Sequence, residues 1–329
     1  MKPFNPAVCA VFFALGTIPG AAQTAATLPA ATEASAAPTL VPARTFNSQL
    51  PLVVWVRTGY FGDPGKRTVG ETPSPQPINI PACLGWGVQP KAGVSLDAVI
   101  QEIQARSIPG LALTTATDDD LAKLKVLTGL QALCLAHAKI TASGLENLND
   151  MTDIRMLDLL WTRMPDASMV QLKNMTKLDW LNLAATGVTD AGLETVGGFN
   201  ELRHLDLGVT DVTTVGLEHL KGLVHLQSLD LNGPPTTDAG MEHLQDMKEL
   251  QMLALGGSKV TDAGLVYVKD MKDLREVNLG GSKQVTDAGL ENFKDLAGLK
   301  SFNVSRTQVT AAGVAGLKTV LPDCNIQTH

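Results

Sequence analysis

Large apolar residues recur along this chain with a period of 24 residues, from about residue 108 to the C-terminus. The pattern is Leu-x-x-Leu-x-Leu, as in Leu178-Leu181-Leu183. Its last two leucines are two residues apart, which is the spacing of side chains on one face of a β-strand. The pattern therefore predicts one short strand per repeat. Its middle position falls on residues 133, 157, 181, 205, 229, 253, 277 and 302.

The second half of each repeat predicts a turn and a helix. Thr-Asp-Ala-Gly-Leu occurs at 189–193, 261–265 and 286–290, and a variant ending in Met occurs at 237–241. Thr or Asp at this place is typical of a helix N-terminus, where an acidic group is also favoured. A fixed period of this size indicates a solenoid, in which each unit buries its apolar face against its neighbours.

We therefore predict an α/β fold, a right-handed βα solenoid of about nine repeats with an N-terminal cap. The strands are expected to centre near residues 112, 134, 158, 182, 206, 230, 254, 278 and 303. Leu181 and Leu205 should be fully buried. Thr or Ser should bond backbone groups of the adjacent turn in six repeats, at Thr162, Thr186, Thr210, Ser258, Ser282 and Thr307.

The repeated string Leu-x-Leu-x-x-Thr-x-Val-Thr-Asp-Ala-Gly-Leu resembles the leucine-rich repeat family. More narrowly, it resembles bacterial repeats with helical convex sides, in the manner of ribonuclease inhibitor. The resemblance covers about residues 108–329, and the ending Leu321-Pro322-Asp323-Cys324-Asn325-Ile326 resembles a terminal strand of such proteins. It implies a curved solenoid that binds proteins on its concave face, without implying one partner or one activity.

The N-terminal third differs in composition and predicts four segments. Lys2, the apolar run 7–18 and Gly20-Ala21-Ala22 predict a signal peptide over residues 1–22. Residues 23–49 are expected to be a disordered Ala/Thr/Pro linker. Residues 50–94 are rich in Gly and Pro and are expected to form an irregular cap. The leucine-rich repeat domain is then assigned to residues 95–329.

Charge and composition exclude some classes of function. The formal net charge is -7, whereas nucleic-acid binding demands a basic surface. After signal cleavage no segment is apolar enough to cross a membrane, so we expect an exported protein, periplasmic or secreted. His and Cys spacings match no metal site. We expect a monomer with no cofactor.

Three cysteines remain after signal cleavage. Cys83 and Cys134 are the one pair that we consider for a disulfide, with Cys134 facing outward beneath the cap. Cys324 alternates with Ile326 and is expected to point into the core and stay reduced.

Residues that flank the inward leucines should form columns on the concave face, because neighbouring strands lie about 4.8 Å apart. Trp180 is the one concave tryptophan, and such residues dominate interface hot spots. Asp206 beside Asp230 is an unfavourable pair unless a cation or basic partner relieves it. The predicted binding patch comprises Met156, Asp158, Trp180, Asn182, His204, Asp206 and Asp230.

Other interpretations of these residues stay open. The aspartates can belong to a solvated Asn/Asp column, bind Lys or Arg of a partner, or bind Ca²⁺. Trp180 can be packed on its own neighbours. No Ser or Cys nucleophile joins His204 and Asp206, so the patch is not read as catalytic.

The pattern favours a binding protein, with no enzymatic activity, that contacts another protein through the concave strand face. The first alternative is recognition of a cell-envelope or host glycan. The second is a secreted effector or an unrecognised enzyme that uses residues 46–94.

Overall fold

The computed structural model describes residues 40–57, 67–83 and 85–328. Contacts divide the chain into Met1–Pro38 and Thr39–His329, and all the described residues belong to the second unit. The predicted signal peptide and most of the predicted linker therefore lie outside the described residues. Those predictions stay predictions.

One sheet of 13 strands organises the described part of the chain, in the order β15-β14-β13-β12-β11-β10-β9-β8-β7-β6-β5-β2-β3. From β6 onward the strands are parallel, and equivalent residues of successive repeats pair, as Leu181 pairs with Leu205. These strands are β6 Gly110–Ala112, β7 Ala132–Cys134, β8 Met156–Asp158, β9 Trp180–Asn182, β10 His204–Asp206, β11 Ser228–Asp230, β12 Met252–Ala254, β13 Glu276–Asn278, β14 Ser301–Asn303 and β15 Asn325–Gln327.

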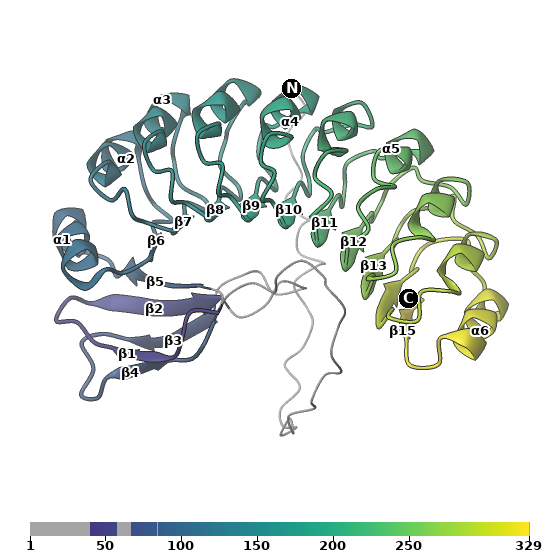
Figure 1. Ribbon diagram of the computed structural model, residues 1–329, viewed down its shortest axis with the longest axis horizontal. Coiled ribbons are helices and arrows are strands. Elements are labelled where there is room, and N and C mark those ends of the chain that lie inside the picture. Colours follow the sequence, from purple (N-terminus) through teal and green to yellow (C-terminus); the bar gives the residue numbers. More distant parts are fainter. Residues whose placement is uncertain (1–39, 58–66, 84, 329) are drawn as a thin grey trace. The chain divides into compact units, whose positions relative to one another are not determined.

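Short helical segments follow the strands and lie along the outer side of the arc in Figure 1, while the strands line its inner side. Five of those described are 3-10 helices of three to seven residues. They are α2 Asp118–Leu124, α3 Ala142–Leu145, η2 Glu146–Leu148, η3 Asp166–Leu172, α4 Asp190–Val196, η4 Gly216–Leu220, α5 Asp238–Glu242, η5 Gly264–Val268, η6 Gly289–Phe293 and α6 Ala311–Val320.

The leucines of the repeat fill the space between strands and helices. Leu181 and Leu205 are 1% and 2% exposed, which confirms the predicted register. The predicted fold class, a βα leucine-rich repeat solenoid, is confirmed. Each of the nine predicted strands centres one residue earlier than predicted, on the buried apolar residue itself.

The Asp of Thr-Asp-Ala-Gly-Leu joins neighbouring repeats. Asp238 Oδ1 accepts a hydrogen bond from the Thr261 amide at 2.7 Å, and Oδ2 accepts one from the Thr261 hydroxyl at 2.7 Å. The same pair of bonds links Asp190 to Thr213. The predicted capping role is therefore incomplete, because the Thr hydroxyl serves the preceding repeat. We call this the Asp–Thr clamp.

The Gly of the same motif leaves room for the clamp. A Cβ at Gly264 would lie 2.3 Å from Asp238 Oδ1, and one at Gly216, the equivalent position of a repeat that lacks the full motif, would lie 2.4 Å from Asp190 Oδ1. Real Cβ atoms do not approach oxygen so closely, so any larger residue would displace the aspartate. The predicted hydroxyl bonds are confirmed at the four threonines, as where the Thr186 hydroxyl donates to the Leu183 carbonyl at 2.6 Å. The hydroxyls of Ser258 and Ser282 instead bond each other at 3.0 Å, and Ser282 also donates to the Leu255 carbonyl of the preceding repeat.

The cap is more regular than predicted. It contains β1 Arg44–Phe46, β2 Leu52–Arg57, β3 Arg67–Glu71, β4 Ile78–Ile80, β5 Gly85–Pro90 and α1 Leu96–Arg106. The prediction of an irregular segment over 50–94 is wrong, and β1 falls inside the predicted linker 23–49. Pro73, Pro75 and Pro77 lie in the loop between β3 and β4, so these prolines separate two strands and do not interrupt either of them.

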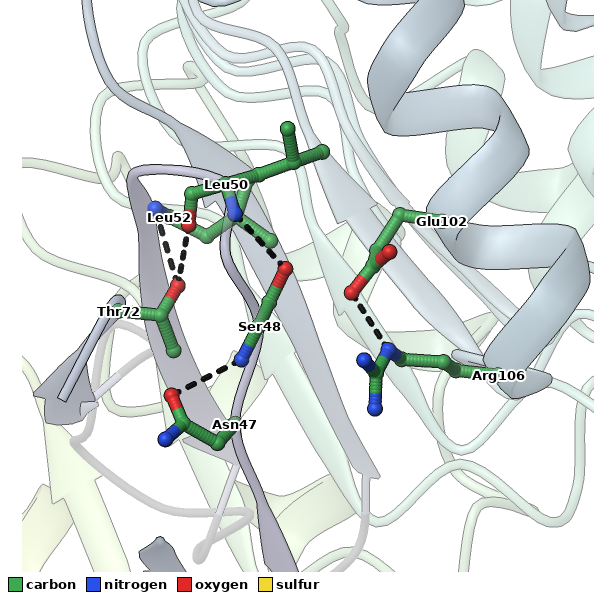
Figure 2. A network of polar contacts seen from close by, with 7 residues as sticks. All are labelled: Asn47, Ser48, Leu50, Leu52, Thr72, Glu102 and Arg106. Atoms are coloured by element: carbon green, nitrogen blue, oxygen red, sulfur yellow. Dashed lines mark hydrogen bonds and ion pairs between the residues drawn. The ribbon is translucent and has the colours of Figure 1, made fainter. Parts of the chain in front are cut away.

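Polar contacts fix the start of β2 (Figure 2). The Thr72 hydroxyl donates to the Leu50 carbonyl at 2.6 Å and accepts from the Leu52 amide at 3.2 Å. Beside them, the Ser48 hydroxyl accepts from the Leu50 amide. β2 then pairs antiparallel with β5, and β5 joins the parallel sheet at β6. The cap therefore closes the N-terminal edge of the repeat sheet.

The considered Cys83–Cys134 disulfide is wrong, because both thiols are reduced. Cys83 belongs to the leucine core, and burial raises the pKa of its thiol. Cys134 lies on the inner face beside Trp55, and its Sγ donates to Asp158 Oδ2 at 3.2 Å. The two sulfurs therefore belong to different packed clusters. Cys324 is buried and reduced, as predicted.

Candidate functional site

The structure divides the predicted patch in two. Met156, Asp158, Asn182 and His204 are buried, between 3% and 8% exposed. Trp180, Asp206 and Asp230 are half-buried. The seven residues do share one strand face, as predicted, but its part over β8 and β9 offers little surface to a partner.

The last residue of β2 accounts for part of this burial. The Arg57 guanidinium lies 5.2 Å from the centre of the Trp180 ring, a cation–π contact. Arg57 Nη1 is also 3.7 Å from Asp179 Oδ1. Trp180 therefore packs against its own chain, which was one of the two interpretations of this residue. Burial raises the pKa of Asp179, and the charge of Arg57 opposes that rise.

His204 is unsuited to acid–base chemistry at neutral pH. Burial lowers the pKa of its imidazole to about 2, and the positive charges of Arg57 and Arg203 act in the same direction. The ring is therefore neutral across the physiological range. Met156 lies in the packed inner-face cluster with Trp55 and Cys134.

The column at the end of the strands has a structural role in every repeat that carries Asp or Asn there. In each case the side-chain oxygen accepts a hydrogen bond from the backbone amide two residues later. Asp206 Oδ1 accepts from the Gly208 amide at 2.9 Å, and Asn278 Oδ1 accepts from the Gly280 amide at 2.9 Å. The same bond occurs at Asp158, Asn182, Asp230 and Asn303. Asn therefore meets this requirement as well as Asp does.

Asp206 and Asp230 are paired residues of β10 and β11. Each is an ionisable carboxyl group where the backbone hydrogen bond needs only a neutral Asn. Burial raises the pKa of Asp206 from 3.8 to about 7, and the neighbouring Asp230 charge adds to the rise. Burial raises the pKa of Asp230 too, against hydrogen bonds from Asn232. Among the described residues, no Lys or Arg forms an ion pair with either carboxylate.

Half-buried polar side chains continue this surface toward the C-terminus. They include Glu276, whose pKa is raised by burial. The strand face of β10 to β14, which we call the acidic strand face, presents Asp206, Asp230, Met252, Glu276, Asn278, Ser301 and Asn303 as half-buried side chains.

A second feature was missed by the sequence analysis. In the repeats of β7 to β14, the backbone has a positive φ two residues after the last apolar residue of the strand pattern. Gly233, Gly257 and Gly281 occupy this position in three later repeats, but earlier repeats place His137, Trp161, Ala185 and Val209 there. Arg306 occupies it in the last repeat. We call residues 137, 161, 185 and 209 the αL row.

The αL row carries a conformational cost. A left-handed conformation costs a residue other than Gly roughly 1–2 kcal/mol, and it is an outlier for a β-branched residue such as Val209. Trp161 and Val209 are nevertheless 43% and 47% exposed. The recurring Gly at this place in later repeats is the signal from which the row could have been found.

Other kinds of site find no support in the part of the chain that the structure describes. It contains no group of three or more His, Cys, Asp or Glu that could hold a metal ion. Within the same residues, no helix combines the length and hydropathy needed to cross a membrane.

Comparisons with known proteins agree with the fold. No protein-family model and no curated protein sequence matches the chain. Among solved structures, it is similar to an internalin, InlF, from Listeria monocytogenes str. 4b F2365, with 19% identity and a TM-score of 0.55 over 71% of this chain and 73% of that one. It is also similar to internalin C2 of the same strain, with 22% identity and a TM-score of 0.52 over 65% of this chain and 84% of that one. Internalins are bacterial leucine-rich repeat proteins, and these likenesses show that this chain has the leucine-rich repeat fold.

Proposed function

We propose that this chain is an exported leucine-rich repeat protein that binds another protein through its acidic strand face. The partner would present Lys or Arg side chains to Asp206 and Asp230. The observation that carries this proposal is the adjacency of these two carboxylates, each with a raised pKa and neither in an ion pair among the described residues.

The fold does not require this charge. Asn182 and Asn278 make the same bond to the backbone two residues on without carrying a charge. Two adjacent like charges destabilise a sheet, whereas a cationic partner would convert the repulsion into attraction. A rigid solenoid also loses little conformational entropy when it binds. The Asp206–Asp230 pair therefore destabilises the free protein and would be stabilised by a bound cationic partner.

Export rests on the sequence alone. Lys2, the apolar run 7–18 and Gly20-Ala21-Ala22 have the order of a signal peptide. Expression in a bacterial host followed by cell fractionation and mass measurement of the product tests this part. Cleavage after Ala22 in the exported fraction would support it, and an uncleaved cytoplasmic product would refute it.

A selection from a phage-displayed library of random short peptides tests the binding surface. The bait is the chain from residue 23 onward, compared with the Asp206→Asn, Asp230→Asn double variant. We expect peptides rich in Lys and Arg, with affinity at least about tenfold lower for the variant. The matched control is Asp270→Asn, Asp295→Asn, which removes the same charge from two exposed loop positions.

Two results would overturn the proposed surface. One is equal loss of affinity in both double variants, which would mean that only net charge matters. The other is the absence of any basic peptide that depends on Asp206 and Asp230. The pH dependence of peptide binding supplies a further check, because a cationic peptide binds the ionised form of the Asp206–Asp230 pair. Affinity should therefore fall as the pH drops through about 7, the pKa of Asp206.

A further inference from the structure

We propose that the αL row, together with Lys139 and Arg163, is a second interaction surface that binds an acidic protein segment carrying an aromatic or large aliphatic side chain. This inference does not rest on the proposed function, because it uses different residues and the opposite charge. It arises from His137, Trp161, Ala185 and Val209, which occupy one backbone position in four successive repeats.

The row is an exposed apolar surface with an ordered aromatic pair. The His137 and Trp161 rings are stacked, with centroids 6.3 Å apart and planes 16° from parallel. Trp161 is 43% exposed, and Val209 is 47% exposed. Ala185 lies between them in the row and is half-buried. Trp161 is therefore held in a defined orientation while much of its surface stays open to a partner.

The repeat does not need side chains at these positions. The Trp161 amide donates to the Ala184 carbonyl at 3.0 Å, and the Gly257 amide donates to the Gly280 carbonyl at 2.9 Å. The backbone connection is thus the same with a tryptophan or a glycine. Because glycine adopts a positive φ without strain, the side chains of the row add strain and exposed apolar area to the free protein. Such outliers point to a function for the side chain.

Two basic residues flank the aromatic pair. Lys139 follows His137 by two residues, and Arg163 follows Trp161 by two residues. Both are exposed, and neither forms an ion pair with another described residue. In a chain with a net charge of -7, a basic pair beside an exposed tryptophan is a local reversal of charge. This reversal favours an acidic partner.

The dimensions of the row favour an extended protein segment over a single sugar. Four neighbouring positions spaced by about 4.8 Å span about 14 Å, the length of some four extended residues. Trp161 has His137 on one ring face, and Ala185 and Val209 continue the row with apolar groups only. A sugar would need acceptors for its hydroxyl groups, whereas an aromatic or aliphatic side chain needs none.

The same peptide selection, with other variants, tests this surface. Peptides captured by the wild-type chain are measured by fluorescence anisotropy against Trp161→Gly and against the double variant Lys139→Glu, Arg163→Glu. We expect a class rich in Asp, Glu and aromatic residues, with affinity at least about tenfold lower for both variants. The matched control is Lys259→Glu, Lys283→Glu, at the same repeat positions beside Gly257 and Gly281. It should change affinity by less than about twofold.

Trp161→Gly also separates binding from folding, because Gly suits the positive φ. Its thermal midpoint should stay within a few degrees of the wild type, and a large fall would show a structural role that overturns the proposal. Acidic peptides that bind equally to Trp161→Gly, or equal losses in the two charge-reversal variants, would also overturn it. So would a glycan array that shows Trp161-dependent sugar binding when no Trp161-dependent peptide exists. Asp206→Asn, Asp230→Asn should leave these acidic peptides bound, so the two surfaces can fail separately.

Discussion

The repeats of β7 to β10 and those of β11 to β14 have the same frame but present different surfaces. Both halves bury the middle leucine of each repeat, as at Leu181 and Leu253. Both use the Asp–Thr clamp, as at Asp190 and Asp238. The two halves differ at the position with a positive φ. The earlier half has the αL row there, and three repeats of the later half have glycine.

The inner faces differ in the same way. In the earlier half, Trp55 packs beside Cys134 and Met156, and Arg57 lies over Trp180. In the later half, Glu276, Asn278 and Asn303 remain half-buried with no such cluster around them among the described residues. The cap therefore occupies the strand face at one end of the solenoid, and the other end keeps a polar face that a partner can reach.

The difference between the two halves separates the residues that a repeat protein needs for its fold from those that are candidates for binding. A residue that recurs in both halves, such as a core leucine or a clamp aspartate, serves the fold. A residue that replaces an adequate alternative at a cost in stability, as Asp206 replaces Asn or Val209 replaces Gly, is a candidate for binding.

Truncation of a core leucine is the largest effect that we predict, and it should be the same in both halves. Leu205→Ala and Leu253→Ala should each lower the free energy of unfolding by about 2–5 kcal/mol, because each leaves a cavity in a packed core. Denaturant unfolding measures both. A loss below about 1 kcal/mol in only one of them would mean that the two halves do not share one frame.

Loss of an Asp–Thr clamp should cost less. Asp190→Ala and Asp238→Ala each remove two hydrogen bonds to a carboxylate, so each should lower the free energy of unfolding by about 1–3 kcal/mol. Asp→Asn at the same positions keeps the acceptor for the Thr amide and should cost less than Ala. Equal costs for Asn and Ala would show that charge, and not the amide bond, holds the repeats together.

Asp206→Asn should stabilise the protein at high pH. The pKa of Asp206 in the folded protein is raised from 3.8 to about 7, so the group contributes stability below about pH 4 that is lost as the pH rises through about 7. The variant lacks this loss and should be more stable at about pH 8 by about 1–2 kcal/mol, after allowance for partial solvent exposure. Near pH 4 the two proteins should unfold together. Destabilisation at about pH 8 would contradict this account.

Val209→Gly should produce the smallest effect, a gain of about 0.5–1 kcal/mol at most, because relief of the left-handed strain is partly offset by the greater freedom of Gly in the unfolded chain. The reverse change, Gly257→Val, should destabilise by roughly 1–2 kcal/mol. Thermal unfolding compares the two. If both changes destabilise equally, the two halves differ in backbone as well as in side chains.

Periodicity was sufficient to predict the frame. Spacing alone placed the strands within one residue and identified Leu181 and Leu205 as core, because a leucine repeated at a fixed interval has one way to be buried. It could not predict the cap. Strands β3 and β5 carry Gly and Pro at their ends or inside them, and their pairing depends on β2 rather than on any local pattern.

The candidate site was predicted less well. The columns on the strand face were right, but their exposure was not, because the cap that buries Met156 is remote in sequence. That Arg57 would lie over Trp180 cannot be read from either residue. The like-charge pair of Asp206 and Asp230 was predicted from their positions in neighbouring repeats. The hydrogen bond that each carboxylate accepts from the backbone amide two residues later depends on the turn geometry and was not predicted.

Direct titration of the Asp206 and Asp230 carboxyl groups tests the central claim, that these repeats carry charge beyond what the frame needs. The carbon resonances of the two carboxyl groups are followed by NMR from acid to alkaline pH in the free protein, with each single Asn variant for assignment. We predict that Asp206 titrates near pH 7 and that its pKa falls in Asp230→Asn, since the neighbouring charge is then absent, while burial, the larger cause, keeps it above 3.8. Ordinary pKa values near 3.8 for both groups, unchanged in the single variants, would contradict the account.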